Sequence, residues 1–354
     1  MESKKEDINK DTPYVKLPLI SYPMNIIVRN KNKGSFLTIE TSHRNKSLEP
    51  FKKLVKNSGK RMIKEYGYAS KAGQMVIGKT KQNQDSIIIE ANFGIDGNSH
   101  LFAVADGHGQ FGEKVSFFIK CTFPRYFFLW FLGHLETFLK TENEHKAIQR
   151  AYEITNNELK CTRIDIRYSG ATCSCVLLTK GKLFTGNIGD SRSLLCSIID
   201  GKECCKELTS DHKPSLPAEK ARIEASGGEV RRIISENGEE YGPYRVYIKG
   251  ERSPGLAMSR SFGDTVAASV GLIAEPDITE TSIKPQDKII VLGSDGIWDR
   301  LSNEEVMRMA FKYSKSDQPE KAVNAIITEA RKRWADYGVH IDDISCILIV
   351  LNAV

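Results

Sequence analysis

The chain has 354 residues and a mass of 39.7 kDa, with 40% hydrophobic and 27% charged residues. These values are typical of a globular protein with one large domain or two smaller ones. The net charge of +6 is concentrated at the start: residues 1–70 hold 15 Lys and Arg against 7 Asp and Glu, whereas the remainder holds 36 against 38. Because no RNA- or DNA-binding motif accompanies the basic leader, we expect a solvated segment and no nucleic-acid partner.

Targeting signals are absent from the sequence pattern. The first seven residues contain no apolar run of the kind a secretory signal needs, and Glu2 excludes N-myristoylation. The apolar stretch from Phe127 to Leu132 is too short to span a bilayer. The eight cysteines form no C-x-x-C pair, which favours reduced thiols over a zinc site. We therefore expect an intracellular monomer, cytoplasmic or nuclear or both, without an integral membrane segment.

The chain begins with a mixed, basic stretch. Residues 1–66 combine Lys, Asn and Ser with short apolar patches, which predicts a partly ordered N-terminal extension. Strand-like segments start near Tyr66. Helices are predicted over residues 112–123, ending at Pro124, then over about 126–139 and 142–160, where apolar residues recur at helical spacing.

Turn residues in the middle of the chain predict antiparallel strands. Lys180-Gly181 and Asp200-Gly201 each separate two apolar runs, which is the pattern of a two-residue β-hairpin. Residues 211–254 interrupt this rhythm and predict an inserted flap, with a short helix over about 217–225 followed by charged loops. Two further helices and a final strand, from Ile344 to Leu351, complete the predicted elements.

Aspartates lie at the ends of five strand-like segments. They are Asp85, Asp106, Asp190, Asp295 and the pair Asp342-Asp343. A single such aspartate is equally consistent with a solvated Asp-Gly turn, but five of them favour a site for a hard cation such as Mg²⁺ or Mn²⁺. In the turn Asp106-Gly107-His108-Gly109, the histidine can carry a proton near neutral pH, and the glycines allow a ligand to approach the backbone.

The order of motifs resembles one family, the metal-dependent protein serine/threonine phosphatases of type 2C. The matching segments are Asn83-Gln84-Asp85, Ala105 to Gly109, Ser169-Gly170-Ala171-Thr172, Gly186 to Arg192, Asp211-His212-Lys213-Pro214, Gly255 to Asp264, Ser294 to Asp299 and Asp342-Asp343-Ile344-Ser345. The resemblance implies an α+β fold, in which two antiparallel sheets form a central β-sandwich with helices on both sides. It covers residues 67–354, the predicted catalytic domain, with the flap at about 211–254.

The resemblance also implies a two-metal centre. Asp106 would bridge both ions, the Gly107 carbonyl would bind one, and Asp295 and Asp342 would bind the other. A hydroxide bridging the ions would attack phosphorus directly.

Other residues take roles around this centre by resemblance. Asp85 would hold metal-bound water, and His108 would give a proton to the departing alkoxide. Asp190 and Asp299 would hold a third, weaker ion.

Two positions depart from the family pattern. Gln84 stands where the family often has glutamate, and Thr80 stands where its phosphate-binding arginine usually lies. Lys79 and Lys81 flank Thr80, and we predict that they bind phosphate as point charges.

The leading hypothesis is a Mg²⁺- or Mn²⁺-dependent phosphatase that hydrolyses phosphoserine and phosphothreonine in phosphoprotein substrates. The alternative is a pseudophosphatase that uses the same fold as a binding scaffold. We expect Arg222 and Arg260 to brace the flap and the sheet end rather than to touch substrate.

Overall fold

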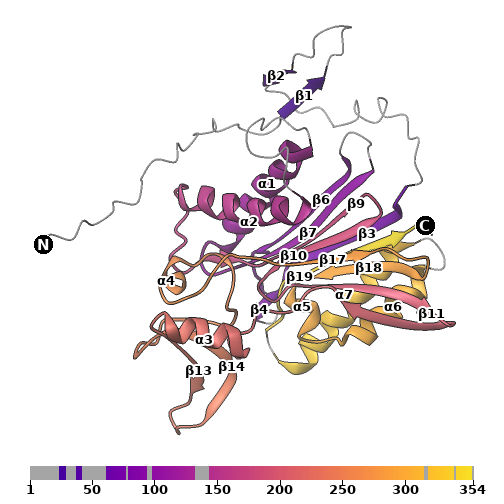
Figure 1. Ribbon diagram of the computed structural model, residues 1–354. Helices are drawn as coiled ribbons and strands as arrows, with labels where there is room; N and C mark the ends of the chain where they lie inside the picture. The colour runs from indigo at the N-terminus through magenta and orange to yellow at the C-terminus, as the bar shows by residue number, and fades with distance from the viewer. Residues whose placement is uncertain are drawn as a thin grey trace, which may run out of the picture. The chain divides into compact units, whose positions relative to one another are not determined.

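The computed structural model describes residues 24–28, 37–41, 61–76, 79–93, 98–131, 143–314, 318–338 and 340–352. The chain divides into two compact units, Met1–Leu54 and Val55–Val354. In the first unit, strands β1 (Met24–Val28) and β2 (Leu37–Thr41) pair antiparallel (Figure 1). In neither unit does a helix of the described ranges have the length and apolar character needed to cross a bilayer.

Two antiparallel sheets form the centre of the second unit (Figure 1). The first has the order β16-β8-β7-β9-β10-β17, with β6 paired to β7, and the second has the order β12-β11-β18-β19-β3. The strands of the first are β6 (Asp85–Phe93), β7 (Ser99–His108), β8 (Gly170–Ala171), β9 (Cys173–Thr179), β10 (Lys182–Ile188), β16 (Phe262–Gly263) and β17 (Asp277–Ser282). Those of the second are β3 (Ile63–Lys71), β11 (Arg192–Ile199), β12 (Lys202–Glu207), β18 (Asp287–Gly293) and β19 (Ile344–Leu351).

The two sheets pack face to face. Side chains from the inner faces of both, such as Phe102 and Val176 from one and Ile290 and Ile347 from the other, belong to a single buried cluster. Alternating strand residues supply this cluster because successive side chains of a strand point to opposite faces. β3 begins at Ile63, ahead of the predicted domain boundary at residue 67, and pairs with β19 along its length.

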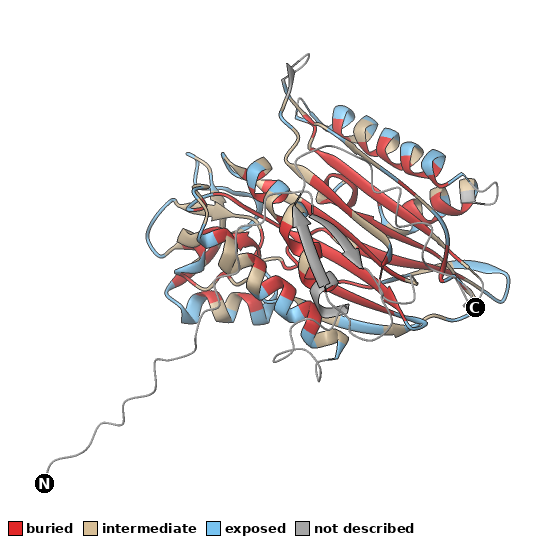
Figure 2. Cartoon of the chain, turned by 90° about the horizontal axis from the view of Figure 1, so that it is seen from above, coloured by how far each residue is buried: buried red, intermediate tan, exposed pale blue. Residues whose placement is uncertain are grey.

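Helices cover the outer face of each sheet, and their apolar sides point toward the strands (Figure 2). On the first sheet these are α1 (Gly112–Phe131) and α2 (Glu144–Lys160). On the second they are α5 (Asp295–Trp298), α6 (Asn303–Ser314) and α7 (Pro319–Tyr337). This arrangement confirms the predicted sandwich with helices on both sides.

Pro124 does not end the first helix, contrary to the prediction. α1 continues through it to Phe131. Phe123 and Phe127 lie on successive turns, 5.3 Å apart between ring centroids, and Phe123 also packs on Tyr152 of α2. Burial of these rings outweighs the single backbone hydrogen bond that proline removes. The rest of the predicted second helix, residues 132–139, lies outside the described residues.

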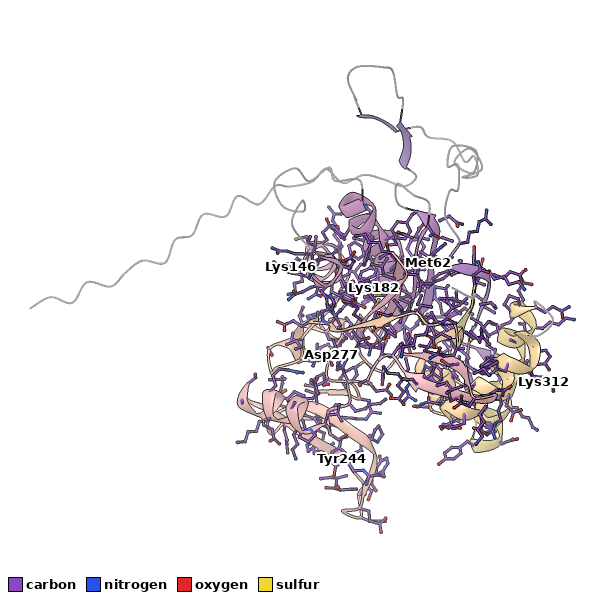
Figure 3. All side chains as sticks on the ribbon, turned by 45° about the vertical axis from the view of Figure 1, so that its right-hand side comes forward. Met62, Lys146, Lys182, Tyr244, Asp277 and Lys312 are labelled. Carbon is purple, nitrogen blue, oxygen red and sulfur yellow. The ribbon has the colours of Figure 1, made fainter. Side chains whose placement is uncertain are left out.

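The inserted flap contains more strand than the sequence suggested. After α3 (Pro217–Ala225), the predicted loop is a small sheet of β13 (Gly228–Ile234), β14 (Glu240–Ile248) and β15 (Pro254–Leu256). One face packs on α3 through Val230, Val246 and Ile223, while the opposite face carries half-buried charged residues, such as Arg231, beside the buried Tyr247. Because charged and apolar residues are mixed in this segment, the sequence pattern did not predict these strands. Figure 3 labels Tyr244 on β14, well away from Met62, just before β3, and from Lys312 on α6.

Three short elements remain. β4 (Gln74–Val76) and β5 (Lys79–Thr80) pair with each other just before β6, and α4 (Thr265–Ala268) follows β16. β4 and β5 lead into the segment that carries Lys81 and Asp85, and α4 directly follows Asp264. These three residues belong to the site described below.

Candidate active site

The sandwich brings the ends of strands from both sheets together at one place. Asp85, the first residue of β6, lies opposite Asp106 of β7 in the antiparallel register. From the other sheet, Asp295 follows the end of β18, and Asp342 lies just before the start of β19, which pairs with β18. We call six side chains the acid cluster: Asp85, Asp106, Asp190, Asp295, Asp299 and Asp342.

The carboxylates of the acid cluster affect one another's protonation. Burial is the largest cause that raises the pKa of Asp106 well above its usual range, and the charges of Asp85, Asp295 and Asp342 raise it further. Burial, followed by the charge of Asp190, raises the pKa of Asp295 in the same way. Burial likewise raises the pKa of Asp85 to about 6, against hydrogen bonds from Ser345 and Ser294 that lower it. Concentrated negative charge of this kind favours the binding of a cation.

Several oxygen atoms of the acid cluster are free to bind a metal ion. Asp85 Oδ1, Asp190 Oδ1 and Asp295 Oδ1 are buried without a hydrogen-bond partner. Buried polar atoms normally have partners, so unpaired carboxylate oxygens in one cluster fit the needs of Mg²⁺ or Mn²⁺. In the described part of the chain, no three acidic, histidine or cysteine side chains are arranged so that they could hold a metal ion as they stand. The donor set therefore fits divalent cations in chemistry and charge, without a preformed cage.

At Gly107 the backbone of β7 lies very close to the backbone of Gly112 and Gln84. A side-chain carbon on this residue would lie 2.2 Å from the Gly112 carbonyl oxygen and 2.6 Å from that of Gln84. Only glycine fits at this position. The close approach keeps the turn after Asp106 tight and beside the acid cluster.

Two lysines compensate part of the cluster's charge. Lys81 Nζ lies 2.6 Å from Asp342 Oδ1 and 3.2 Å from Asp343 Oδ2. Lys213 Nζ lies 2.6 Å from Asp190 Oδ2. Burial lowers the pKa of Lys81, but the charges and hydrogen bonds of Asp342 and Asp343 prevail and raise it above its usual range.

The phosphate-binding roles of Lys79 and Lys81 stay predictions. Lys81 is held by carboxylates in this structure. The backbone of Lys79 belongs to β5, but its side chain lies outside the described residues.

Gln84 has a structural role that a glutamate could not copy. Its amide Nε2 donates a hydrogen bond to the Gly109 carbonyl at 2.7 Å, and its backbone N–H donates to Asp343 Oδ2 at 2.9 Å. A carboxylate has no hydrogen to donate in the first of these bonds. Asp343 also accepts from the Gly73 N–H at 2.7 Å, so this buried residue braces the site.

His108 is held by a partner that the sequence reasoning missed. Its Nε2 lies 2.6 Å from Asp264 Oδ2, and its Nδ1 is buried without a hydrogen-bond partner. Asp264 is the last residue of the matched segment Gly255 to Asp264, but it is not at the end of an apolar strand run and so gave no separate signal.

The bracing roles predicted for two arginines are confirmed. Arg260 pairs with Glu219 at 2.7 Å and with Asp277 at 2.8 Å. Arg222 pairs with Glu219 at 2.8 Å and donates to the Gly271 carbonyl. These contacts tie α3 of the flap to Arg260, just before β16, and to Gly271, just after α4.

Comparison with known proteins places this architecture in one family. The protein phosphatase 2C family model matches residues 72–336. Probable protein phosphatase 2C 61 of Arabidopsis thaliana is 34% identical over 277 residues, covering 76% of this chain and 81% of that protein. Probable protein phosphatase 2C 12 of Oryza sativa subsp. japonica is 31% identical over 320 residues, covering 78% and 79%.

A solved structure shares the fold. The serine-threonine phosphatase 2C from Toxoplasma gondii superposes with a TM-score of 0.69 at 21% identity, covering 82% of this chain and 98% of that one. With the sandwich, the acid cluster at its strand ends and the family model's match to most of the sequence, the chain belongs to the protein phosphatase 2C family.

Proposed function

We propose that the chain is a Mg²⁺- or Mn²⁺-dependent phosphatase that hydrolyses phosphoserine and phosphothreonine in proteins. The observation that supports this most is the partly buried acid cluster, which has three buried carboxylate oxygens without a hydrogen-bond partner beside a concentration of like charge. Such a cluster destabilises the fold unless cations compensate it. Its retention at the meeting point of two sheets is therefore best explained by a function that needs the cations.

The residues divide into ion-binding and proton-handling groups. Asp106, Gly107, Asp295 and Asp342 would hold two ions, and Asp190 with Asp299 would hold a third. When bound, such ions neutralise phosphate charge and acidify a coordinated water. Asp85 lies beside Asp106 and accepts a hydrogen bond from Ser294 through Oδ2 at 2.9 Å, which leaves its Oδ1 atom without a partner. His108 is the proton donor for the departing alkoxide.

A surface cavity next to Asp85 supports the proposal that the substrate is a polypeptide. Its volume is about 550 Å³, and it lies between β3, β6 and the start of α1. Tyr68 and Phe117 on its walls are 55% and 60% exposed, and Glu113 and Lys120 add one charge of each sign. Aromatic faces and both charges offer contacts to residues that flank a phosphoserine.

The test is hydrolysis by the full chain with and without metal. The wild type should release phosphate from p-nitrophenyl phosphate and from a phosphoserine peptide with millimolar Mn²⁺, and EDTA should abolish this. Asp106→Asn should be inactive, whereas Asp287→Asn should be active. Asp287 is a matched control because it is also buried but lies at the opposite end of β18, bonded to Ser197. A folded wild type that binds the peptide without hydrolysing it would instead support the scaffold alternative.

A further inference from the structure

We propose that Asp264 is a positioning residue that holds His108 through Nε2, so that Nδ1 is the nitrogen that delivers the proton to the leaving oxygen. This inference rests on the proposed phosphatase function and assigns the two ring nitrogens different tasks. It starts from one contact: His108 Nε2 lies 2.6 Å from Asp264 Oδ2. The carboxylate is 3% exposed, so water does not compete for it.

Asp264 is itself fixed in place. Ser261 Oγ donates to the same Oδ2 atom, and the Asp264 backbone N–H donates to the Ser169 carbonyl at 3.1 Å. The residue has φ = 43°, in the left-handed region that favours Gly, Asn and Asp. A residue restrained by one hydrogen bond to its carboxylate and one from its backbone, in an unusual backbone conformation, is organised to hold one partner.

The strand order explains how Asp264 reaches His108. His108 of β7 pairs with Gly170 of β8, and Gly170 pairs on its other side with Gly263 of β16. Asp264 follows directly and extends its side chain over Gly170. A side-chain carbon on Gly170 would lie 2.1 Å from Asp264 Oδ2, so any other residue there would displace the carboxylate. The glycine of the Ser169-Gly170-Ala171-Thr172 motif is thus needed for this contact.

The contact fixes which nitrogen is available for chemistry. With Nε2 directed at the carboxylate, its hydrogen stays there, as in other histidine–carboxylate pairs. Nδ1 is buried without a partner and is the nitrogen that remains. In the step we propose, a hydroxide derived from water bonds to phosphorus as the phosphorus–oxygen bond to the serine breaks, and the serine alkoxide takes the Nδ1 proton of the doubly protonated imidazole. His108 is left neutral, with its remaining proton on Nε2.

A comparison of two substrates separates this role from a structural one. An alkoxide leaving group needs a proton, whereas p-nitrophenolate departs as a stabilised anion. His108→Ala should slow phosphoserine-peptide hydrolysis by about 10²–10⁴-fold and p-nitrophenyl phosphate hydrolysis far less. Asp264→Asn, which suits the left-handed backbone, should show the same selectivity, with a loss at least about tenfold greater on the peptide. The double variant should be no slower than His108→Ala alone.

Three further variants keep the test decisive. Ser261→Ala should give a smaller loss in the same substrate-selective direction, and it covers the case in which Asp264→Asn fails to fold. Gly170→Ala should reproduce the loss because the methyl group would meet the Asp264 carboxylate oxygen at 2.1 Å, together with the Phe262 carbonyl oxygen at 2.4 Å. Asp287→Asn, the buried control, should lower stability without any selectivity between the substrates.

The outcomes distinguish the inference from the function. Equal losses on both substrates, or none, in the Asp264 and Ser261 variants of an active enzyme would overturn the positioning role and leave the phosphatase intact. A His108→Ala variant without selectivity would also overturn it. A wild type with no metal-dependent hydrolysis of either substrate would overturn the proposed function itself, and the inference with it.

Discussion

Lys81 places its ammonium nitrogen 2.6 Å from Asp342 Oδ1, at a carboxylate that the family resemblance assigns to a metal ion. A lysine and a divalent cation would both compensate the charge of this carboxylate, so the two would compete for it. Lys81 enters from the segment just before β6, and its side chain is 17% exposed. The acid cluster therefore has an internal counter-ion that a bound metal must displace or share.

Replacing this counter-ion should change metal affinity. Lys81→Met should raise Mn²⁺ affinity by about 3–10-fold because one positive charge no longer opposes the ion. It should also lower the melting temperature in EDTA, where Asp342 loses its partner. Titration calorimetry on metal-free protein measures the first effect. Lys182→Met, which removes only an exposed pair with Glu280, is the control. Unchanged or weaker affinity in Lys81→Met would show that Lys81 does not compete.

The raised pKa of Asp85 predicts a pH-dependent stability of the metal-free protein. Its folded-state pKa of about 6 exceeds its ordinary value of 3.8, so the ionised group destabilises the fold at pH 7 and the penalty disappears on acidification. Asp85→Asn should therefore be more stable than wild type by about 1–3 kcal/mol at pH 7. Urea unfolding in EDTA should show the difference shrinking from pH 7 to pH 4. A difference that stays constant with pH would contradict the account.

Metal binding should stabilise the wild type by compensating the cluster. Millimolar Mn²⁺ should raise the melting temperature, since a ligand that binds only the folded state adds to its stability. Asp106→Asn should lose most of this increase, because Asp106 is influenced by the charges of Asp85, Asp295 and Asp342 together. Differential scanning calorimetry with and without metal measures this increase in melting temperature. An equal metal-induced increase in both proteins would remove Asp106 from the metal site.

The stability of the flap should depend on Glu219. This residue is 3% exposed and binds Arg222, Arg260 and Ser259. Glu219→Gln leaves the partly buried Arg222 without its charge partner and Arg260 with Asp277 alone, and should cost about 2–3 kcal/mol. Burial alone would raise the pKa of Glu219. The hydrogen bonds from Arg222, Arg260 and Ser259 prevail, however, and hold this pKa below its ordinary value of 4.5.

The sign of the pH effect follows from that lowered value. The stability contributed by Glu219 is fully present above its ordinary pKa and is lost as the pH falls through the lowered one. The gap between wild type and Glu219→Gln should thus be wide at pH 7 and narrow in strong acid, as measured by urea unfolding. Proteolysis should also cut the Glu219→Gln flap faster. A variant with wild-type stability and protection would show that the flap is held elsewhere.

Local signals predicted much of the fold. Lys180-Gly181 and Asp200-Gly201 do form the turns β9–β10 and β11–β12, with positive φ at all four residues, because their two-residue spacing and glycines leave few other solutions. The strand-end aspartates were predictable for a related reason: a carboxylate next to a long apolar run is unusual. Pro124 misled because the tertiary packing of Phe123 outweighed a local preference.

Contacts between distant segments could not be read from the sequence. Lys81 and Asp342 are separated by 261 positions, and His108 and Asp264 by 156. Each pair depends on the strand order, which hydrophobic periodicity does not reveal. Gln84 was noted only as a departure from the family pattern. Its bond to Gly109 depends on the backbone of a turn 25 residues away.

The central claim is that the acid cluster binds divalent metal in order to hydrolyse phosphate esters. The most direct measurement is phosphate release from a phosphoserine peptide by the full chain, titrated with Mn²⁺ after EDTA treatment, for wild type, Asp106→Asn and Asp287→Asn. The account predicts saturable, metal-dependent release by wild type and Asp287→Asn, and none by Asp106→Asn. Release that continues in EDTA, or that Asp106→Asn retains, would contradict it.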